Sequence, residues 1–157
     1  MSESKLDRTI LVPKDQVDRF FFGEIPTNLW RALRSDSPLP LLAPVEKGYM
    51  MDNRQFRRPD ITVETVENKE WVIIHPTKPE GTSTFDRSQT FKGKRWDYYR
   101  LPEGTKIPDG LVIVKDGYNE SFEATHYTIA PVRSMLLSTY KRLLADLAQS
   151  AIKEGNL

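Results

Sequence analysis

The last part of the chain decides the fold class, and it reads HYTIAPVRSMLLSTYKRLLADLAQSA from His126 to Ala151. Its first four residues alternate between polar and apolar side chains, which is the pattern of a strand with one buried face. Beyond them, apolar residues recur at steps of three and four, which predicts a long C-terminal helix of about five turns, with Pro131 in its first turn and Gly155 at its end. The predicted apolar helix face contains Leu136, Tyr140, Leu143, Leu144, Leu147 and Ala151. We therefore expect an α+β fold in which one terminal helix packs on a sheet.

Short strands are predicted upstream of this segment, because alternating or continuous apolar runs stand between turn-forming residues. They cover residues 29–33, 61–66, 71–74, 98–101 and 111–114. Residues 35–60 contain four prolines and no clean period, so we expect an irregular, proline-rich loop with at most one helical turn. Residues 1–28 resemble an N-terminal arm or short helix, and we expect a single domain over residues 29–157.

The composition excludes several classes of protein. The 157 residues suit one compact domain, and 23 Lys and Arg against 22 Asp and Glu leave no strong positive field for nucleic acid. Without cysteine there are no disulfides or thiolate metal sites, and two histidines far apart in sequence predict no metal site. No signal peptide and no run of about 18 apolar residues is present, so we expect a cytoplasmic protein that only another machine would export.

Polar residues in strand-like segments are the first candidates for a site, since the common enzyme signatures are absent. Burial of Arg31 in a strand is favourable only if its guanidinium meets an anion. That anion is either a phosphate or carboxylate of a ligand or, as the structural alternative, an Asp or Glu of the protein. The hydroxyls of Thr82, Ser83 and Thr84 suit a ribose or a carboxamide, and their structural alternative is hydrogen bonding at a strand edge or turn.

Histidines and charged residues supply further candidates. His126 is either a hydrogen-bonded core residue or a group that orients a ligand or transfers a proton near neutral pH. His75 is expected in a surface loop, and Asp86 and Arg87 are expected to form a local ion pair. Three arginines within residues 54–58 form a basic cluster that either contacts phosphate or belongs to a solvated surface.

Several motifs stand in an order that resembles a known toxin family. They are LWRA at 29–32, RPD at 58–60, GTSTFDR at 81–87, LPEGT at 101–105 and ATHYTI at 124–129. In this order they are similar to the second Tse family of type VI secretion effectors, which are antibacterial toxins that act in the cytoplasm. The likeness is specific from about Arg58 to the start of the last helix, because the strings at 81–87 and 124–129 would rarely arise together by chance.

The resemblance implies a fold, an activity and partners. The fold is expected to be ADP-ribosyltransferase-like, with short strands in a split or mixed sheet, and toxicity is expected to depend on NAD as co-substrate. The resemblance further implies a cognate immunity protein, export by the type VI secretion apparatus without a cleavable signal peptide, and action in the cytoplasm of the target cell.

The same resemblance implies roles for individual residues. Arg31 matches the first-strand arginine that contacts the phosphates or ribose of NAD. Thr82 and Ser83 match the paired hydroxyl residues needed for toxicity, which serve both NAD binding and catalysis. His126 stands at the third motif and is expected to face the same cleft as a catalytic residue.

The third motif also shows a departure from many ADP-ribosyltransferases. Those enzymes carry a glutamate there, whose carboxylate holds a ribose hydroxyl and stabilises the positive charge that develops as nicotinamide leaves. In this sequence His126 stands at that place, and Glu120 and Glu123 do not have the spacing of a paired-glutamate motif. Nicotinamide is expected to stack on Tyr118 or on Trp96.

Four activities remain open on this basis. An ADP-ribosyltransferase is the first, and an NAD hydrolase is the second. A nucleic-acid-cutting toxin would use His126, His75 and the arginines of residues 54–58. A non-catalytic interaction toxin would occupy a partner through the apolar residues Phe20–Phe22.

Overall fold

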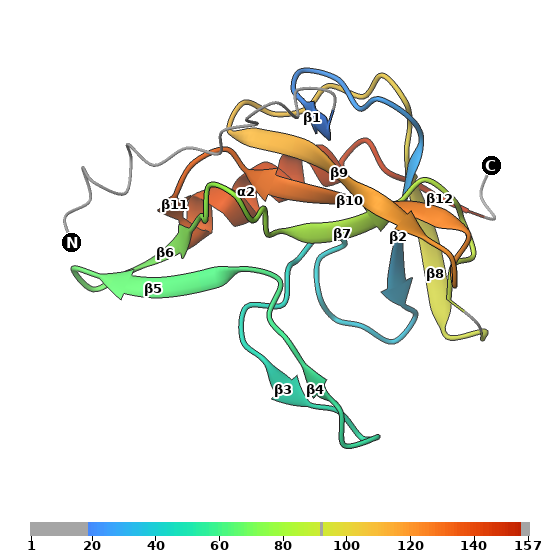
Figure 1. Ribbon diagram of the computed structural model, residues 1–157, viewed down its shortest axis with the longest axis horizontal. Coiled ribbons are helices and arrows are strands. Elements are labelled where there is room, and N and C mark those ends of the chain that lie inside the picture. The colour runs from blue at the N-terminus through green and yellow to red at the C-terminus, as the bar shows by residue number, and fades with distance from the viewer. Residues whose placement is uncertain (1–18, 92, 155–157) are drawn as a thin grey trace.

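A computed structural model of the protein describes residues 19–91 and 93–154, and a seven-stranded sheet is its main element (Figure 1). The strand order β1-β9-β10-β7-β2-β8-β12 is not the sequence order, so the two halves of the chain are interleaved in one sheet. Every pairing in it is antiparallel. The strands are β1 (Phe20–Phe21), β9 (Leu111–Asn119), β10 (Ala124–Pro131), β7 (Thr82–Phe85), β2 (Leu29–Arg34), β8 (Trp96–Leu101) and β12 (Ile152–Lys153).

Two smaller sheets accompany the large one. One has the order β11 (Met135–Leu136), β6 (Lys69–Ile73) and β5 (Thr62–Val66), and the other pairs β3 (Tyr49–Met50) with β4 (Phe56–Arg57). β5 and β6 form a hairpin with a two-residue turn, in which Glu67 and Asn68 both have positive φ, as type I′ turns require. The β3–β4 hairpin extends away from the body of the molecule (Figure 1).

The core lies between the large sheet and the helix α2 (Leu137–Ala148). Helix residues Leu137, Tyr140, Leu144 and Leu147 are buried and pack against sheet residues such as Ile129. The hydroxyl of Tyr140 is fully buried and donates a hydrogen bond to the Ile129 carbonyl at 2.7 Å. The helix is thereby joined to the middle of the sheet by a polar contact as well as by apolar packing.

Removal of that hydroxyl tests the contact between helix and sheet. We expect Tyr140→Phe to lower the free energy of unfolding by about 1–2 kcal/mol, because a buried carbonyl loses its donor while the ring still fills its space. Tyr118→Phe is the matched control, since Tyr118 is 63% exposed and should change stability by no more than about 0.5 kcal/mol. Urea denaturation of both variants measures the difference, and equal midpoints would show that the Tyr140 contact adds nothing.

The C-terminal helix is shorter than the sequence predicts. It has 12 residues rather than about five turns, and Pro131 is the last residue of β10, where it pairs with Leu111. Residues 135–136 leave the predicted helix because they pair with β6 as the strand β11. Ala151 lies beyond the helix, although it still packs on the same core, so its apolar character extended the helical pattern past the true end. Gly155, the expected end, lies outside the described residues.

The predicted strands are all present, and the segments between them hold further strands. Residues 35–48 contain turns and bends without helix or strand, and the β3–β4 hairpin stands where one helical turn was allowed. Residues 1–18 lie outside the described residues, while Phe20 and Phe21 pair with β9 at one edge of the large sheet. The domain boundary before residue 29 stays a prediction. In the part of the chain that the structure describes, no helix has the length and apolar character to cross a membrane.

Candidate active site

A cavity of about 530 Å³ lies between the strands β2, β7 and β8 and the segment that follows β2. Its volume is in the range of small-molecule sites. Three residues expected from the sequence, Arg31, Ser83 and Trp96, line it together with other aromatic and charged side chains. The lining residues are Arg31, Ala32, Leu33, Arg34, Ser37, Leu39, Val45, Tyr49, Arg57, Asp60, Ser83, Phe85, Phe91 and Trp96.

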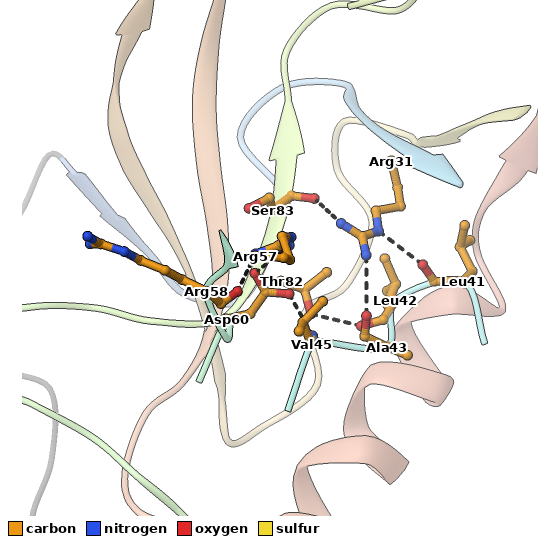
Figure 2. A network of polar contacts seen from close by, with 10 residues as sticks. All are labelled: Arg31, Leu41, Leu42, Ala43, Val45, Arg57, Arg58, Asp60, Thr82 and Ser83. Atoms are coloured by element: carbon orange, nitrogen blue, oxygen red, sulfur yellow. Dashed lines mark hydrogen bonds and ion pairs between the residues drawn. The ribbon is translucent and has the colours of Figure 1, made fainter. Parts of the chain in front are cut away.

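The guanidinium of Arg31 holds three parts of this cavity wall together (Figure 2). Its Nε donates to the Leu41 carbonyl at 3.1 Å, Nη1 to the Ser83 carbonyl at 3.0 Å and Nη2 to the Ala43 carbonyl at 3.2 Å. The structural alternative expected for Arg31 was a salt bridge to Asp or Glu. That expectation was wrong, because its guanidinium donates to backbone carbonyls instead. Burial lowers the pKa of Arg31, and the negative charge of Asp60 acts in the opposite direction.

Asp60 holds the C-terminal end of the same segment, at Val45. Its carboxylate accepts the backbone N–H of Val45 at 2.7 Å and the Nη2 of Arg57 at 3.0 Å, and its side chain is 9% exposed. Arg31 and Asp60 thus fix residues 41–45 against β7 from two sides (Figure 2). The segment carries no helix or strand between residues 35 and 48, so these charged side chains, together with a few backbone hydrogen bonds, hold its shape.

Thr82 and Ser83 have different surroundings, although they are neighbours on β7. Thr82 is completely buried, and its hydroxyl donates to the Leu42 carbonyl at 2.8 Å. Burial raises the pKa of Tyr140, and hydrogen bonds involving Thr82 act against that rise, which places Thr82 on the helix side of the sheet. Successive side chains of a strand point to opposite faces, so Ser83 faces the cavity instead. Of the predicted hydroxyl pair, only Ser83 lines the cavity.

His126 lies beside the cavity wall. In the register of β10 and β7 it stands opposite Phe85, and the two rings make an edge contact with centroids 5.1 Å apart. Thr128 stands opposite Ser83 in the same register. Because Phe85 and Ser83 line the cavity, His126 and Thr128 continue the same face of the sheet. Nδ1 of His126 is 2.6 Å from a carboxylate oxygen of Asp116, a partner that the sequence did not suggest.

Tyr118 is not part of this arrangement, whereas Trp96 is. Tyr118 is 63% exposed and pairs with Thr125, the neighbour of His126 on β10, so its side chain belongs to the face opposite His126. The Trp96 ring lines the cavity and stacks on Phe91, with centroids 4.7 Å apart and an interplanar angle of 22°. Of the two candidates for stacking, the structure therefore places only Trp96 at the cavity.

Two comparisons with known proteins bear on this site. A family model described as the Tse2 ADP-ribosyltransferase toxin matches residues 14–155. Toxin Tse2 of Pseudomonas aeruginosa is 37% identical over 114 residues, which cover 73% of this chain and 68% of that protein. The chain belongs to the Tse2 ADP-ribosyltransferase toxin family. It is thus an antibacterial effector toxin that acts through NAD-dependent ADP-ribosylation, and the ADP-ribosyltransferase-like fold is supported by the same match.

The family assignment decides among the four activities that the sequence left open. A Tse2-family toxin is a transferase, so the nucleic-acid-cutting and non-catalytic hypotheses lose their support. The geometry agrees for the histidines, because His75 contacts Thr62 and lies 3.7 Å from Glu80 at the edge of the hairpin β5–β6 rather than beside His126. No group of three or more potential metal ligands occurs among residues 19–91 and 93–154.

The charged residues around the Tse2-family motifs form pairs that the sequence did not predict. Arg87 pairs with Glu123 at 3.0 Å, and Asp86 accepts the backbone N–H of Thr125, so the expected Asp86–Arg87 ion pair was wrong. In the basic cluster Arg57 lines the cavity, whereas the side chain of Arg58 points away from the network (Figure 2). The cavity residues that sequence reasoning missed include Arg34, Asp60 and Phe91.

Proposed function

We propose that this toxin binds NAD in the cavity between β2, β7, β8 and residues 37–60, and transfers ADP-ribose from it to an acceptor. The observation that carries the proposal is the shared lining: one cavity of small-molecule size has the Ser83 hydroxyl, the Trp96 ring and arginine side chains on its wall. These three kinds of group suit the ribose, the aromatic rings and the pyrophosphate of NAD, respectively.

Arg34 is the cation best suited to the pyrophosphate. Arg57 is already neutralised by the buried carboxylate of Asp60, and Arg31 has three of its five N–H groups committed to backbone carbonyls. Arg34 has looser contacts, since its Nε is 3.8 Å from an exposed Asp36 carboxylate and its guanidinium carbon lies 5.9 Å from the centre of the Trp96 ring. In this proposal Arg31 keeps the wall in place and offers its two remaining N–H groups to the dinucleotide.

The reacting end of NAD belongs near Ser83 and His126. The bond between the nicotinamide nitrogen and ribose C1′ breaks with its electrons going to the ring, and C1′ passes through an oxocarbenium-like state before the acceptor attacks. Because the leaving group is already activated, positioning and charge stabilisation supply most of the catalysis. Ser83 holds the ribose or the carboxamide, His126 orients the incoming acceptor, and the Trp96–Phe91 stack forms an aromatic wall for a ring of NAD.

The expected partners follow from the family rather than from the cavity. We propose a cognate immunity protein in the producing cell, export by the type VI secretion apparatus and action in the cytoplasm of the target cell. Membership in a family of toxins supports the immunity protein, because a cell that makes a toxin using NAD, which it also contains, needs protection from that toxin.

Substitution of Arg34 tests the NAD site. We expect Arg34→Gln to raise the KM for NAD about fivefold to tenfold with little change in kcat, because a charge at the pyrophosphate contributes equally to the ground and transition states. Release of nicotinamide by the purified toxin measures both constants. Arg58→Gln is the matched control, since Arg58 is not among the residues that line the cavity. Equal KM values in the two variants would remove Arg34 from the proposed site.

A further inference from the structure

An irregularity in β9 brings a carboxylate to His126. β9 and β10 pair regularly up to Tyr127 opposite Lys115, but His126 is paired with Gly117, so Asp116 is the extra residue of a β-bulge. Bulges of this kind redirect a side chain and are frequent beside functional sites. Here the bulge brings the Asp116 side chain to the face of the sheet that carries His126 and Thr128.

The contacts of this carboxylate are specific. Its Oδ2 accepts a hydrogen bond from the Thr128 hydroxyl at 2.5 Å and lies 2.6 Å from Nδ1 of His126. Arg19 lies on its other side, with Nη2 4.0 Å from Oδ1 and Nε donating to the Lys115 carbonyl. The Asp116 side chain is 29% exposed and the His126 side chain 28%, so water screens the pair only partly.

These contacts determine where the proton of the imidazole lies. An ionised carboxylate only accepts hydrogen bonds, so Nδ1 of His126 carries a proton toward Asp116. In the neutral ring, Nε2 is then the unprotonated nitrogen. Among the described residues Nε2 has no hydrogen-bond partner, and the ring rests against Phe85 of the cavity wall.

We infer that Asp116 is a positioning residue of the transferase, which holds His126 in the tautomer whose Nε2 accepts the proton of the acceptor. In this step a lone pair of the acceptor forms the bond to ribose C1′, and the bond from C1′ to nicotinamide breaks with its electrons going to the ring nitrogen. The proton of the acceptor moves to Nε2, and the resulting imidazolium is stabilised by Asp116. Thr128 keeps the carboxylate turned toward Nδ1. The inference rests on the proposed function, because it needs the reacting end of NAD beside Phe85.

The tautomer of His126 provides a test that does not depend on activity. In ¹⁵N NMR spectra of the full-length toxin, at a pH where His126 is neutral, we expect the Nδ1–H form in the wild type. A neutral histidine side chain in water favours the Nε2–H form, and we expect His126 to adopt it in Asp116→Ala. Glu120→Ala is the matched control, since it removes an exposed carboxylate near the same strands and leaves the histidine–carboxylate pair. An Nε2–H form in the wild type overturns the inference.

Kinetics of the same variants separate positioning from binding. We expect Asp116→Ala to lower kcat for acceptor-dependent nicotinamide release about tenfold or more, with the KM for NAD changed less than about twofold. Asp116→Asn, which keeps the shape and an acceptor oxygen for Nδ1–H, should lose less. Unchanged kcat in Asp116→Ala, with kcat reduced in His126→Ala, overturns the role of Asp116 and leaves the NAD site standing. Unchanged kcat in His126→Ala as well would remove both His126 and Asp116 from the reaction.

Discussion

Replacing Arg31 by methionine is expected to lower the free energy of unfolding by about 2–4 kcal/mol. The carbonyls of Leu41, Ala43 and Ser83 lose their donors at once, and a buried carbonyl without a donor costs about 1 kcal/mol or more. Relief from burying the guanidinium charge offsets part of this loss. Urea denaturation measures it through the midpoint of the transition.

The control and a second variant sharpen this result. Arg58→Met removes an arginine that points away from the network and should change stability by less than about 0.5 kcal/mol. Arg31→Lys should lose nearly as much as Arg31→Met, because one ammonium group cannot replace a planar fork that reaches three carbonyls. If Arg31→Met unfolds at the wild-type urea concentration, the three hydrogen bonds do not hold the cavity wall. Loss of activity in an Arg31 variant is therefore no evidence by itself of a contact with NAD.

Thr82 and Ser83 are expected to differ sharply when substituted, although they are neighbours in one motif. Ser83→Ala should lower kcat/KM for nicotinamide release about a hundredfold, because it removes a hydroxyl placed at the reacting sugar, while stability changes by less than about 0.5 kcal/mol. The backbone carbonyl that Arg31 uses remains in the alanine variant.

Thr82→Val is expected to show the reverse pattern. It removes a buried hydroxyl that donates to Leu42, so it should cost about 1–2 kcal/mol of stability and leave the activity of the folded toxin nearly intact. Thermal unfolding and nicotinamide release on the same preparations give both quantities. A Thr82→Val variant that is stable but inactive would place Thr82, and not only Ser83, in contact with substrate.

The sequence predicts the strands with clear apolar patterns and misses those whose pairing comes from distant segments. β7 is central in the large sheet, yet its residues Thr82–Phe85 follow a glycine and look like a turn. Its neighbours β10 and β2 override that local preference. Gly81 serves close approach rather than a turn, because a Cβ there would collide with the Ile129 carbonyl. The predicted helix is longer than the observed one for a similar reason, since the residues of β11 and Ala151 are also apolar and pack on the core.

The sequence predicted individual residues of the candidate site, but it did not predict contacts that form only when distant strands come together. Ser83 and Trp96 were named from the sequence and line the cavity, but the strand alternation that buries Thr82 required knowledge of β7. The partner of His126 was hidden, because Asp116 reaches it only through a bulge on another strand. The carbonyl partners of Arg31 leave no mark in the sequence, since any residue has a backbone carbonyl.

A crystal structure of the toxin with NAD bound, in the Ser83→Ala variant to slow turnover, examines the placement of the dinucleotide itself. We expect its pyrophosphate within hydrogen-bond distance of Arg34, a ring of NAD against Trp96, and ribose C1′ on the side of Ser83 and His126. NAD bound at any other surface, with the cavity between β2, β7 and β8 empty, would show that the proposed site is wrong.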